Sequence, residues 1–189
     1  MSTSTQNVIE PISADEDSSV PDFKSATRDG PIPVVIEGKF SSQLAYVVKI
    51  IQTEIDLNSE SVAFLHPKGY GWFDTVRKKL NGHDLSFVEL STKADWPEGD
   101  ENIALSTLHS AKGLEFDHVF MIGLNAETTL VGNLDLPEHS EDERVANLRR
   151  LIAMGVGRAR KSVVIGYKPD DAPAVAAFFD PATCKKYSV

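Results

Sequence analysis

Residues 103–124 read IALSTLHSAKGLEFDHVFMIGL and hold two short apolar segments separated by a polar turn. The segments, residues 103–107 and 118–123, are much shorter than a typical buried helix. Short apolar runs of this kind are typical of strands buried inside a sheet. We therefore predict two strands here, joined by the polar turn.

The same pattern continues on both sides of this stretch. Short apolar segments alternate with segments whose apolar residues recur at helical spacing. The further predicted strands are residues 31–38, 61–65, 85–90 and 162–167. The predicted helices are residues 72–80, 141–160 and 173–179, and one that runs to Ile55 from an N-cap at Ser41 or Ser42. This alternation predicts an α/β fold with a mainly parallel sheet and helices on both faces.

Length and composition limit the class of protein. A chain of 189 residues with 41% hydrophobic residues can form one domain with a sizeable core. Its single cysteine, Cys184, excludes a disulfide-stabilised scaffold. No apolar run could cross a bilayer and no secretion signal opens the chain, so we expect a cytoplasmic location without a membrane partner. Residues 1–30 lack periodicity and predict a flexible acidic lead-in to a domain over residues 31–189, with loops at 93–102 and 128–140.

The net charge of -9 excludes a strongly basic, free-standing nucleic-acid binder. The acidic residues are unevenly distributed, because the first 22 residues hold five of the 28 and contain no Lys or Arg. The residues after this segment have more nearly equal numbers of acidic and basic side chains. The overall charge therefore does not exclude a local contact with DNA.

Several common sites are excluded by their spacing. A phosphate-binding Walker A loop needs a glycine five residues before its Gly-Lys pair, but Pro33 precedes Gly38-Lys39 in that position. The Gly155-Val-Gly157 sequence lacks the third glycine of a dinucleotide fingerprint, because Arg160 takes that place. The histidines do not have zinc-site spacing, so we expect no metal site.

The turn between the strands predicted at residues 103–107 and 118–123 carries a more specific signal. It resembles motif V of UvrD/Rep-type superfamily 1 DNA helicases, roughly T-x-H-x-x-K-G-L-E-[FWY]-x-x-V. The matching residues are Thr107, His109, Lys112, Gly113, Leu114, Glu115, Phe116 and Val119.

A second segment resembles motif VI of the same family, in the expected order and at the expected distance. The matching residues are Arg149, Arg150, Leu151, Arg158, Ala159 and Arg160. The chain departs from the motif at Leu148, Ala153, Gly155 and Gly157, which replace an acid, a tyrosine, an alanine and a threonine. The two glycines weaken a helix by about 1 kcal/mol each relative to alanine. Upstream, residues 62–67 are weakly similar to a strand motif of the family, with His66 and Pro67 in place of Tyr and Arg.

The resemblance covers about residues 30–168 and implies one RecA-like lobe of the P-loop NTPase type, the second of the two that such helicases contain. The lobe with Walker A and the magnesium ligands is not in the sequence. By this resemblance, Arg158 is the arginine finger and Gly113 and Glu115 contact ATP, Glu115 through the ribose. Thr107 and His109 would contact single-stranded DNA. ATP and magnesium would be shared with the missing lobe, so we expect neither to be tightly bound by this chain alone.

Plainer interpretations remain open for the same residues. Arg158 could be a solvated basic helix end, Glu115 a turn residue and His109 a structural histidine. For Trp72 and Trp96, packing is favoured over base stacking.

The resulting hypothesis is the C-terminal motor lobe of an ATP-dependent DNA helicase, a piece of a longer chain that is inactive alone. Its partners would be single-stranded or partly duplex DNA and an N-terminal lobe in the same or another chain. The alternatives are a helicase-derived adaptor without ATPase activity and a half that complements a separate Walker A chain. Translocation polarity and pathway, such as DNA repair, stay open.

Overall fold

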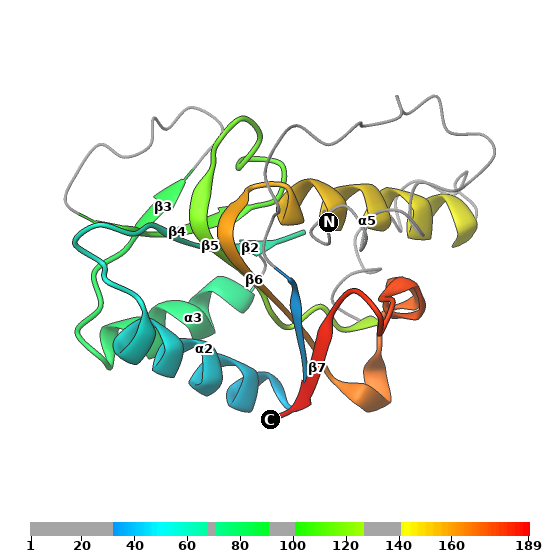
Figure 1. Cartoon of the computed structure of the whole chain (residues 1–189), viewed down its shortest axis with the longest axis horizontal. Helices are drawn as coiled ribbons and strands as arrows, with labels where there is room; N and C mark the ends of the chain where they lie inside the picture. The colour runs from blue at the N-terminus through cyan, green and yellow to red at the C-terminus, as the bar shows by residue number, and fades with distance from the viewer. Residues whose placement is uncertain (1–31, 68–70, 91–100, 127–140) are drawn as a thin grey trace.

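A computed structural model describes residues 32–67, 71–90, 101–126 and 141–189. Seven strands form one sheet in the order β3-β4-β2-β5-β6-β1-β7 (Figure 1). The strands are β1 Val34–Glu37, β2 Val62–His66, β3 Val88–Leu90, β4 Ile103–Thr107, β5 Phe116–Met121, β6 Ala159–Tyr167 and β7 Lys185–Ser188. Each of the strand pairings is parallel, which confirms the predicted sheet.

Helices cover both faces of this sheet, as predicted. Helices α2 (Phe40–Glu54) and α3 (Trp72–Asn81) lie on one face, and α5 (Glu141–Val156) lies on the other (Figure 1). Each face of the sheet has its own hydrophobic core, because successive side chains along β2 point to opposite faces. Phe64 packs with the α2 and α3 side chains, whereas Ala63 and Leu65 pack with those of α5. None of the described helices is long and apolar enough to cross a membrane.

The boundary between α5 and β6 differs from the prediction. The helix ends at Val156 instead of continuing to residue 160, and β6 already begins at Ala159. Gly157 and Arg158 close the last turn through bonds to Ala153 and Gly155, and the Arg158 carbonyl then accepts the Phe116 amide of β5. Arg158 therefore lies in the turn between helix and strand, and the prediction of a helical position was wrong.

Three smaller differences concern the ends of elements. Helix α2 begins after Lys39 without a side-chain cap, so the predicted serine cap is wrong. The predicted last helix, residues 173–179, is a short 3-10 helix, η2 (Ala174–Phe178), and a second one, η1 (Pro169–Asp171), precedes it. Strand β7 was not predicted, because its four residues are all exposed and carry no apolar pattern. The predicted lead-in at 1–30, most of the loop at 93–102 and the loop at 128–140 lie outside the described residues.

Candidate functional site

The turn after β4 is held by hydrogen bonds of its own residues. Thr107 ends β4, and its hydroxyl accepts the Ser110 amide at 3.1 Å. The Leu108 amide donates to the His66 carbonyl at the end of β2, 3.0 Å away. His109 is exposed at this edge of the sheet, where the strands end. Thr107 and His109, the predicted DNA contacts, therefore lie together at the carboxyl end of β4.

The chain then runs back to the opposite edge, where β5 begins. Gly113 lies in this return with a φ of +89°, a left-handed conformation that favours glycine. A Cβ there would have no neighbour within 4 Å, so the requirement comes from the backbone and not from crowding. Gly113 and Glu115 are both exposed, which leaves the return accessible to a ligand.

Arg158 packs against this same return. Its carbonyl accepts the Phe116 amide at 2.8 Å, and its Nη1 donates to the Leu114 carbonyl at 3.5 Å. Its Nε is buried and has no hydrogen-bond partner within the described part of the chain. The structure thus brings together Gly113, Glu115 and Arg158, the three predicted ATP-site residues, although 43 positions separate Glu115 from Arg158 in sequence.

Arg160 adds a second guanidinium beside the return. Its Nε and Nη2 donate to one carboxylate oxygen of Glu115, at 2.9 and 2.8 Å. Both side chains are about half exposed, so water competes with the ion pair. Glu115 is therefore a carboxylate already engaged by an arginine, next to a glycine turn and a second arginine.

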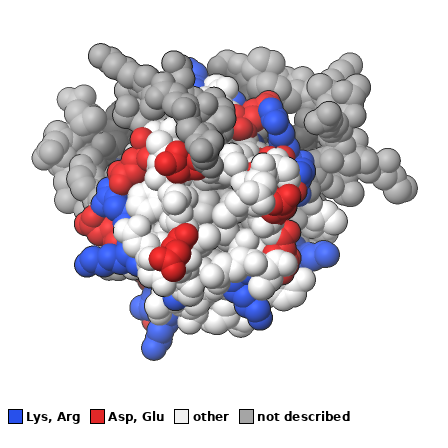
Figure 2. All heavy atoms as spheres, turned by 90° about the vertical axis from the view of Figure 1, so that its left-hand side faces the viewer, with Lys and Arg blue, Asp and Glu red and all other residues white. Residues whose placement is uncertain are grey.

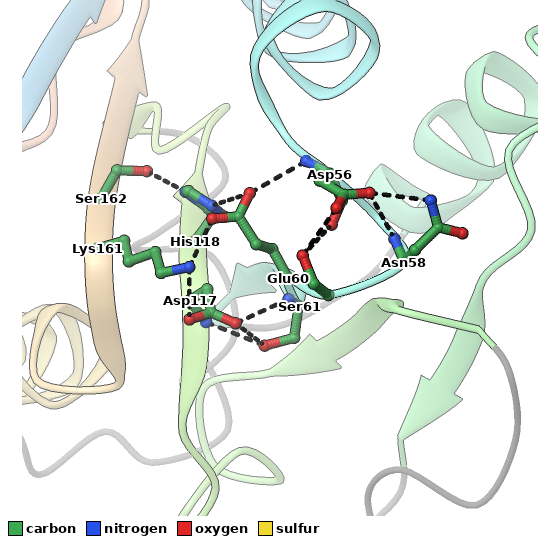
Figure 3. Close-up of polar contacts among 9 residues, drawn as sticks. Asp56, Asn58, Glu60, Ser61, Asp117, His118, Lys161 and Ser162 are labelled. Atoms are coloured by element: carbon green, nitrogen blue, oxygen red, sulfur yellow. Dashed lines mark hydrogen bonds and ion pairs between the residues drawn. The ribbon is translucent and has the colours of Figure 1, made fainter.

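A polar network at the same edge was not predicted from the sequence. Figure 3 shows side chains from the starts of β2, β5 and β6 pointing toward one another. Lys161 of β6 lies 2.5 Å from Glu60 and 3.5 Å from Asp117. Asp117 also accepts the Ser61 amide and hydroxyl at 2.9 and 3.1 Å. Charged residues at strand starts look solvent-exposed in sequence, and only the strand order reveals that these meet.

The network shifts the pKa values of its members. The hydrogen bond from Lys161 lowers the pKa of Glu60. Burial acts to raise the pKa of Asp117, but the bonds from Ser61 and the charge of Lys161 outweigh it, and the pKa is lowered. Both carboxylates are thus stabilised in the charged form that pairs with Lys161.

His118 is the buried histidine of this network. Its Nδ1 lies 2.7 Å from the Ser162 hydroxyl, and its Nε2 lies 3.6 Å from Glu60. Burial lowers its pKa, against the opposing pull of the Glu60 and Asp117 carboxylates. The neutral form is therefore favoured in the folded protein.

Trp72 packs in the core and does not face outward. Its ring is 7% exposed, stacks on His66 at 4.9 Å and donates its Nε1 hydrogen to the Ile122 carbonyl at 2.8 Å. The prediction of packing over base stacking is confirmed for Trp72, while Trp96 lies outside the described residues.

The surface charge and the arrangement of possible metal ligands bear on which ligands this domain can bind. On the face in Figure 2, described Lys and Arg side chains alternate with Asp and Glu around a mostly uncharged centre. Such a mixed surface does not favour a broad electrostatic contact with DNA. Within the described ranges, no group of three or more His, Cys, Asp or Glu residues could hold a metal ion.

Comparison with known proteins gives a consistent result. Residues 78–169 match the model of the UvrD-like helicase C-terminal domain. The ATP-dependent DNA helicase UvrD2 of Mycobacterium tuberculosis is 36% identical over 89 residues, 47% of this chain and 13% of that protein. The ATP-dependent DNA helicase Rep of Buchnera aphidicola is 40% identical over 93 residues, 49% of this chain and 13% of that protein. The match thus spans only about an eighth of the length of these relatives.

Solved structures show the fold. The C-terminal domain of a possible DNA helicase from Lactobacillus plantarum WCFS1 superposes with a TM-score of 0.64 at 18% identity, covering 97% of this chain and 96% of that chain. Saccharomyces cerevisiae Dbp5 bound to Gle1 gives a TM-score of 0.50 at 12% identity, covering 90% of this chain and 45% of that chain. The fold is that of RecA-like helicase C-terminal domains.

Proposed function

Because residues 78–169 match the model of the UvrD-like helicase C-terminal domain, we propose that this chain is the second motor lobe of an ATP-dependent DNA helicase. In this proposal ATP binds between the lobe and an N-terminal lobe that supplies the phosphate-binding loop and the magnesium ligands. The chain alone hydrolyses no ATP, since its sequence has no Walker A loop.

Arg158 is the arginine finger in this proposal. A guanidinium remains charged and offers several donors in one plane, which suits the charge that develops on a transferred phosphoryl group. The observation that carries the proposal is the contact of Arg158 with the motif V return, at the Phe116 amide and the Leu114 carbonyl.

Gly113 and Glu115 would hold the nucleotide next to the finger. The left-handed turn at Gly113 exposes the backbone to close approach. The Glu115 carboxylate would release its hydrogen bonds from Arg160 and accept one from a ribose hydroxyl instead.

The DNA contacts would lie at the other end of the same segment. Thr107 ends β4 and His109 follows it, whereas Glu115 precedes the amino end of β5. The eight residues between β4 and β5 thus hold His109 of one proposed ligand site and Gly113 and Glu115 of the other. Movement of this segment on ATP binding would be transmitted to the strand of DNA, as a translocating motor requires.

Substitution of Arg158 tests this proposal. The size of the natural polypeptide is first measured in its own cells with an antibody. In that polypeptide we would then compare Arg158→Gln with Arg150→Gln, a substitution at an exposed arginine of α5. A motor lobe predicts loss of DNA-stimulated ATP hydrolysis by orders of magnitude for Arg158→Gln, with DNA binding retained. Unchanged hydrolysis, or appreciable hydrolysis by the pure 189-residue chain, would contradict the proposal.

A second candidate is an adaptor that has lost ATPase activity. It is favoured by Ala153 and Gly157, which stand where motif VI has a tyrosine and a threonine. An adaptor predicts a natural polypeptide near 20.7 kDa that neither hydrolyses ATP nor responds to Arg158→Gln. A polypeptide of that size whose hydrolysis requires another chain would instead indicate a complementing half.

A further inference from the structure

Strand β6 contains an extra residue where it first pairs with β5. Phe116 pairs with Ala159 and His118 pairs with Ser162, so two steps along β5 correspond to three along β6. The irregularity is a β-bulge at Arg160 and Lys161. Bulges of this kind change the direction of side chains beside functional sites.

The bulge directs two consecutive cations to different partners. Arg160 pairs with Glu115 in the return before β5, while Lys161 pairs with Glu60 and Asp117 at the starts of β2 and β5. Lys161 therefore ties β6 to the start of its neighbour β5 and to the start of β2, the next strand beyond β5. It lies one residue after Arg160 and three residues after Arg158.

The carboxylates that bind Lys161 are themselves fixed (Figure 3). Asp117 is held by the Ser61 amide and hydroxyl, and Glu60 accepts the Asp56 amide at 3.0 Å. Their side chains are only 18% and 16% exposed for Glu60 and Asp117, which reduces competition from water. The ammonium group is thus bound by a preorganised pair of acceptors.

We infer that Lys161 is a positioning residue for the nucleotide side of this lobe. By holding the bulge, it sets where Arg158 and Arg160 lie against Gly113 and Glu115. Loss of its charge frees the start of β6 to pair regularly with β5, which moves both guanidinium groups. The importance of that movement for ATP rests on the proposed function.

The chain offers a closely matched control. Lys186 of β7 pairs with Glu37 of β1 at 2.8 Å, and its side chain is 51% exposed against 49% for Lys161. Both lysines join neighbouring strands, but Lys186 lies away from the return at 113–115. Lys161→Met and Lys186→Met therefore remove similar ion pairs, and Lys161→Arg restores a cation at the proposed position.

The first readout needs no nucleotide. We would record nuclear magnetic resonance spectra of the whole chain, following the Arg160 Nε–H resonance and hydrogen exchange of the Phe116 amide, which donates to Arg158. Lys161→Met should speed exchange at Phe116 about tenfold beyond any change in the β4 amides and shift the Arg160 resonance. Lys186→Met should do neither, and Lys161→Arg should restore both signals.

The second readout is ATP titration followed at the Gly113 amide. Lys161→Met should weaken binding by about three- to tenfold, a loss that Lys186→Met does not reproduce. If wild-type protein shows no ATP-dependent shift, the chain does not bind ATP without an N-terminal lobe, and the first readout alone decides the positioning role. Equal behaviour of both methionine variants in the first readout would overturn it. If Lys161→Met does not fold, Asp117→Asn must produce the same exchange and resonance changes or the inference is wrong.

Discussion

The Glu115 carboxylate accepts two hydrogen bonds from the Arg160 guanidinium, at 2.9 Å from Nε and 2.8 Å from Nη2. The carboxylate that we propose contacts the ribose is therefore bound to an arginine of the same chain. Because both side chains are about half exposed, the pair is worth less than about 1 kcal/mol. A ligand can displace Arg160 at little cost.

This relationship predicts the effect of Arg160→Gln on a ligand without phosphates. Adenosine offers a ribose but no charge, so its binding reports the competition for Glu115 alone. We expect Arg160→Gln to tighten adenosine binding by up to about fivefold, the equivalent of an exposed ion pair. The measurement is a titration followed at the Gly113 amide, with Arg150→Gln as the control. Weaker adenosine binding would show that Arg160 does not compete with the ribose.

Gly155 is predicted to resist even the smallest side chain. A Cβ at this position would lie 2.5 Å from Leu108 Cδ2 and 2.6 Å from Met121 Sδ, both in fully buried residues. Overpacking of this kind outweighs the gain in helix propensity, so Gly155→Ala should lower the free energy of unfolding by about 1–3 kcal/mol.

Gly157 is the matched control for that substitution. A Cβ there meets backbone oxygens at an ordinary 3.5 Å. Gly157→Ala should therefore change stability little, or raise it by about 0.4–1 kcal/mol through the unfolded state. Urea denaturation of both variants checks the pair, and equal stabilities would contradict the close packing of α5 on Leu108.

Gln43 joins two turns at the carboxyl edge of the sheet from a fully buried position in α2. Its Nε2 donates to the Gly38 carbonyl at 2.6 Å, and its Oε1 accepts the Gly123 amide at 2.9 Å. Gln43→Leu leaves both groups without these bonds, which costs about 1–3 kcal/mol for each. We expect a lower midpoint in thermal unfolding than for Gln52→Leu, since Gln52 is exposed on the same helix. Similar midpoints would show that water replaces the amide.

The strands that could be predicted are those whose own residues require burial on both faces. Residues 103–107 are apolar enough to define β4, and the structure has that strand at the predicted bounds. Strand β7, with the sequence KKYS, is exposed at all four residues, and its strand pairing is with β1. Because β1 lies far from β7 in the sequence, no local sequence pattern could predict this strand.

Some residues of the candidate site could likewise be predicted from the sequence, and others could not. The motif resemblance identified Glu115 and Arg158, and the structure places both at the same return. It did not identify the bulge or Lys161, because these depend on β2, β5 and β6 being neighbours in that order. Gly155 was interpreted as a weak point of the helix, whereas in the structure a Cβ at this position would crowd the buried Leu108 and Met121 side chains.

The buried His118 predicts how stability responds to mild acid. Burial lowers its pKa below the ordinary 6.5, although Glu60 and Asp117 oppose the shift and Lys161 supports it. As the pH falls below about 6.5, the unfolded chain gains a proton that the folded protein does not, so the free energy of unfolding falls. Above that pH the histidine is neutral in both states and contributes no slope.

His118→Gln isolates this effect from the carboxylates of the same network. The pKa values of Glu60 and Asp117 are lowered from 4.5 and 3.8, so the stability they contribute is lost only at more acidic pH. We expect urea unfolding between pH 7.5 and 5.5 to show a smaller decline for His118→Gln than for wild type. His109→Gln, at an exposed histidine, is the control variant. The slope decides the matter even if His118→Gln is less stable throughout, and an unchanged slope would mean that His118 takes up its proton equally in the folded and unfolded states.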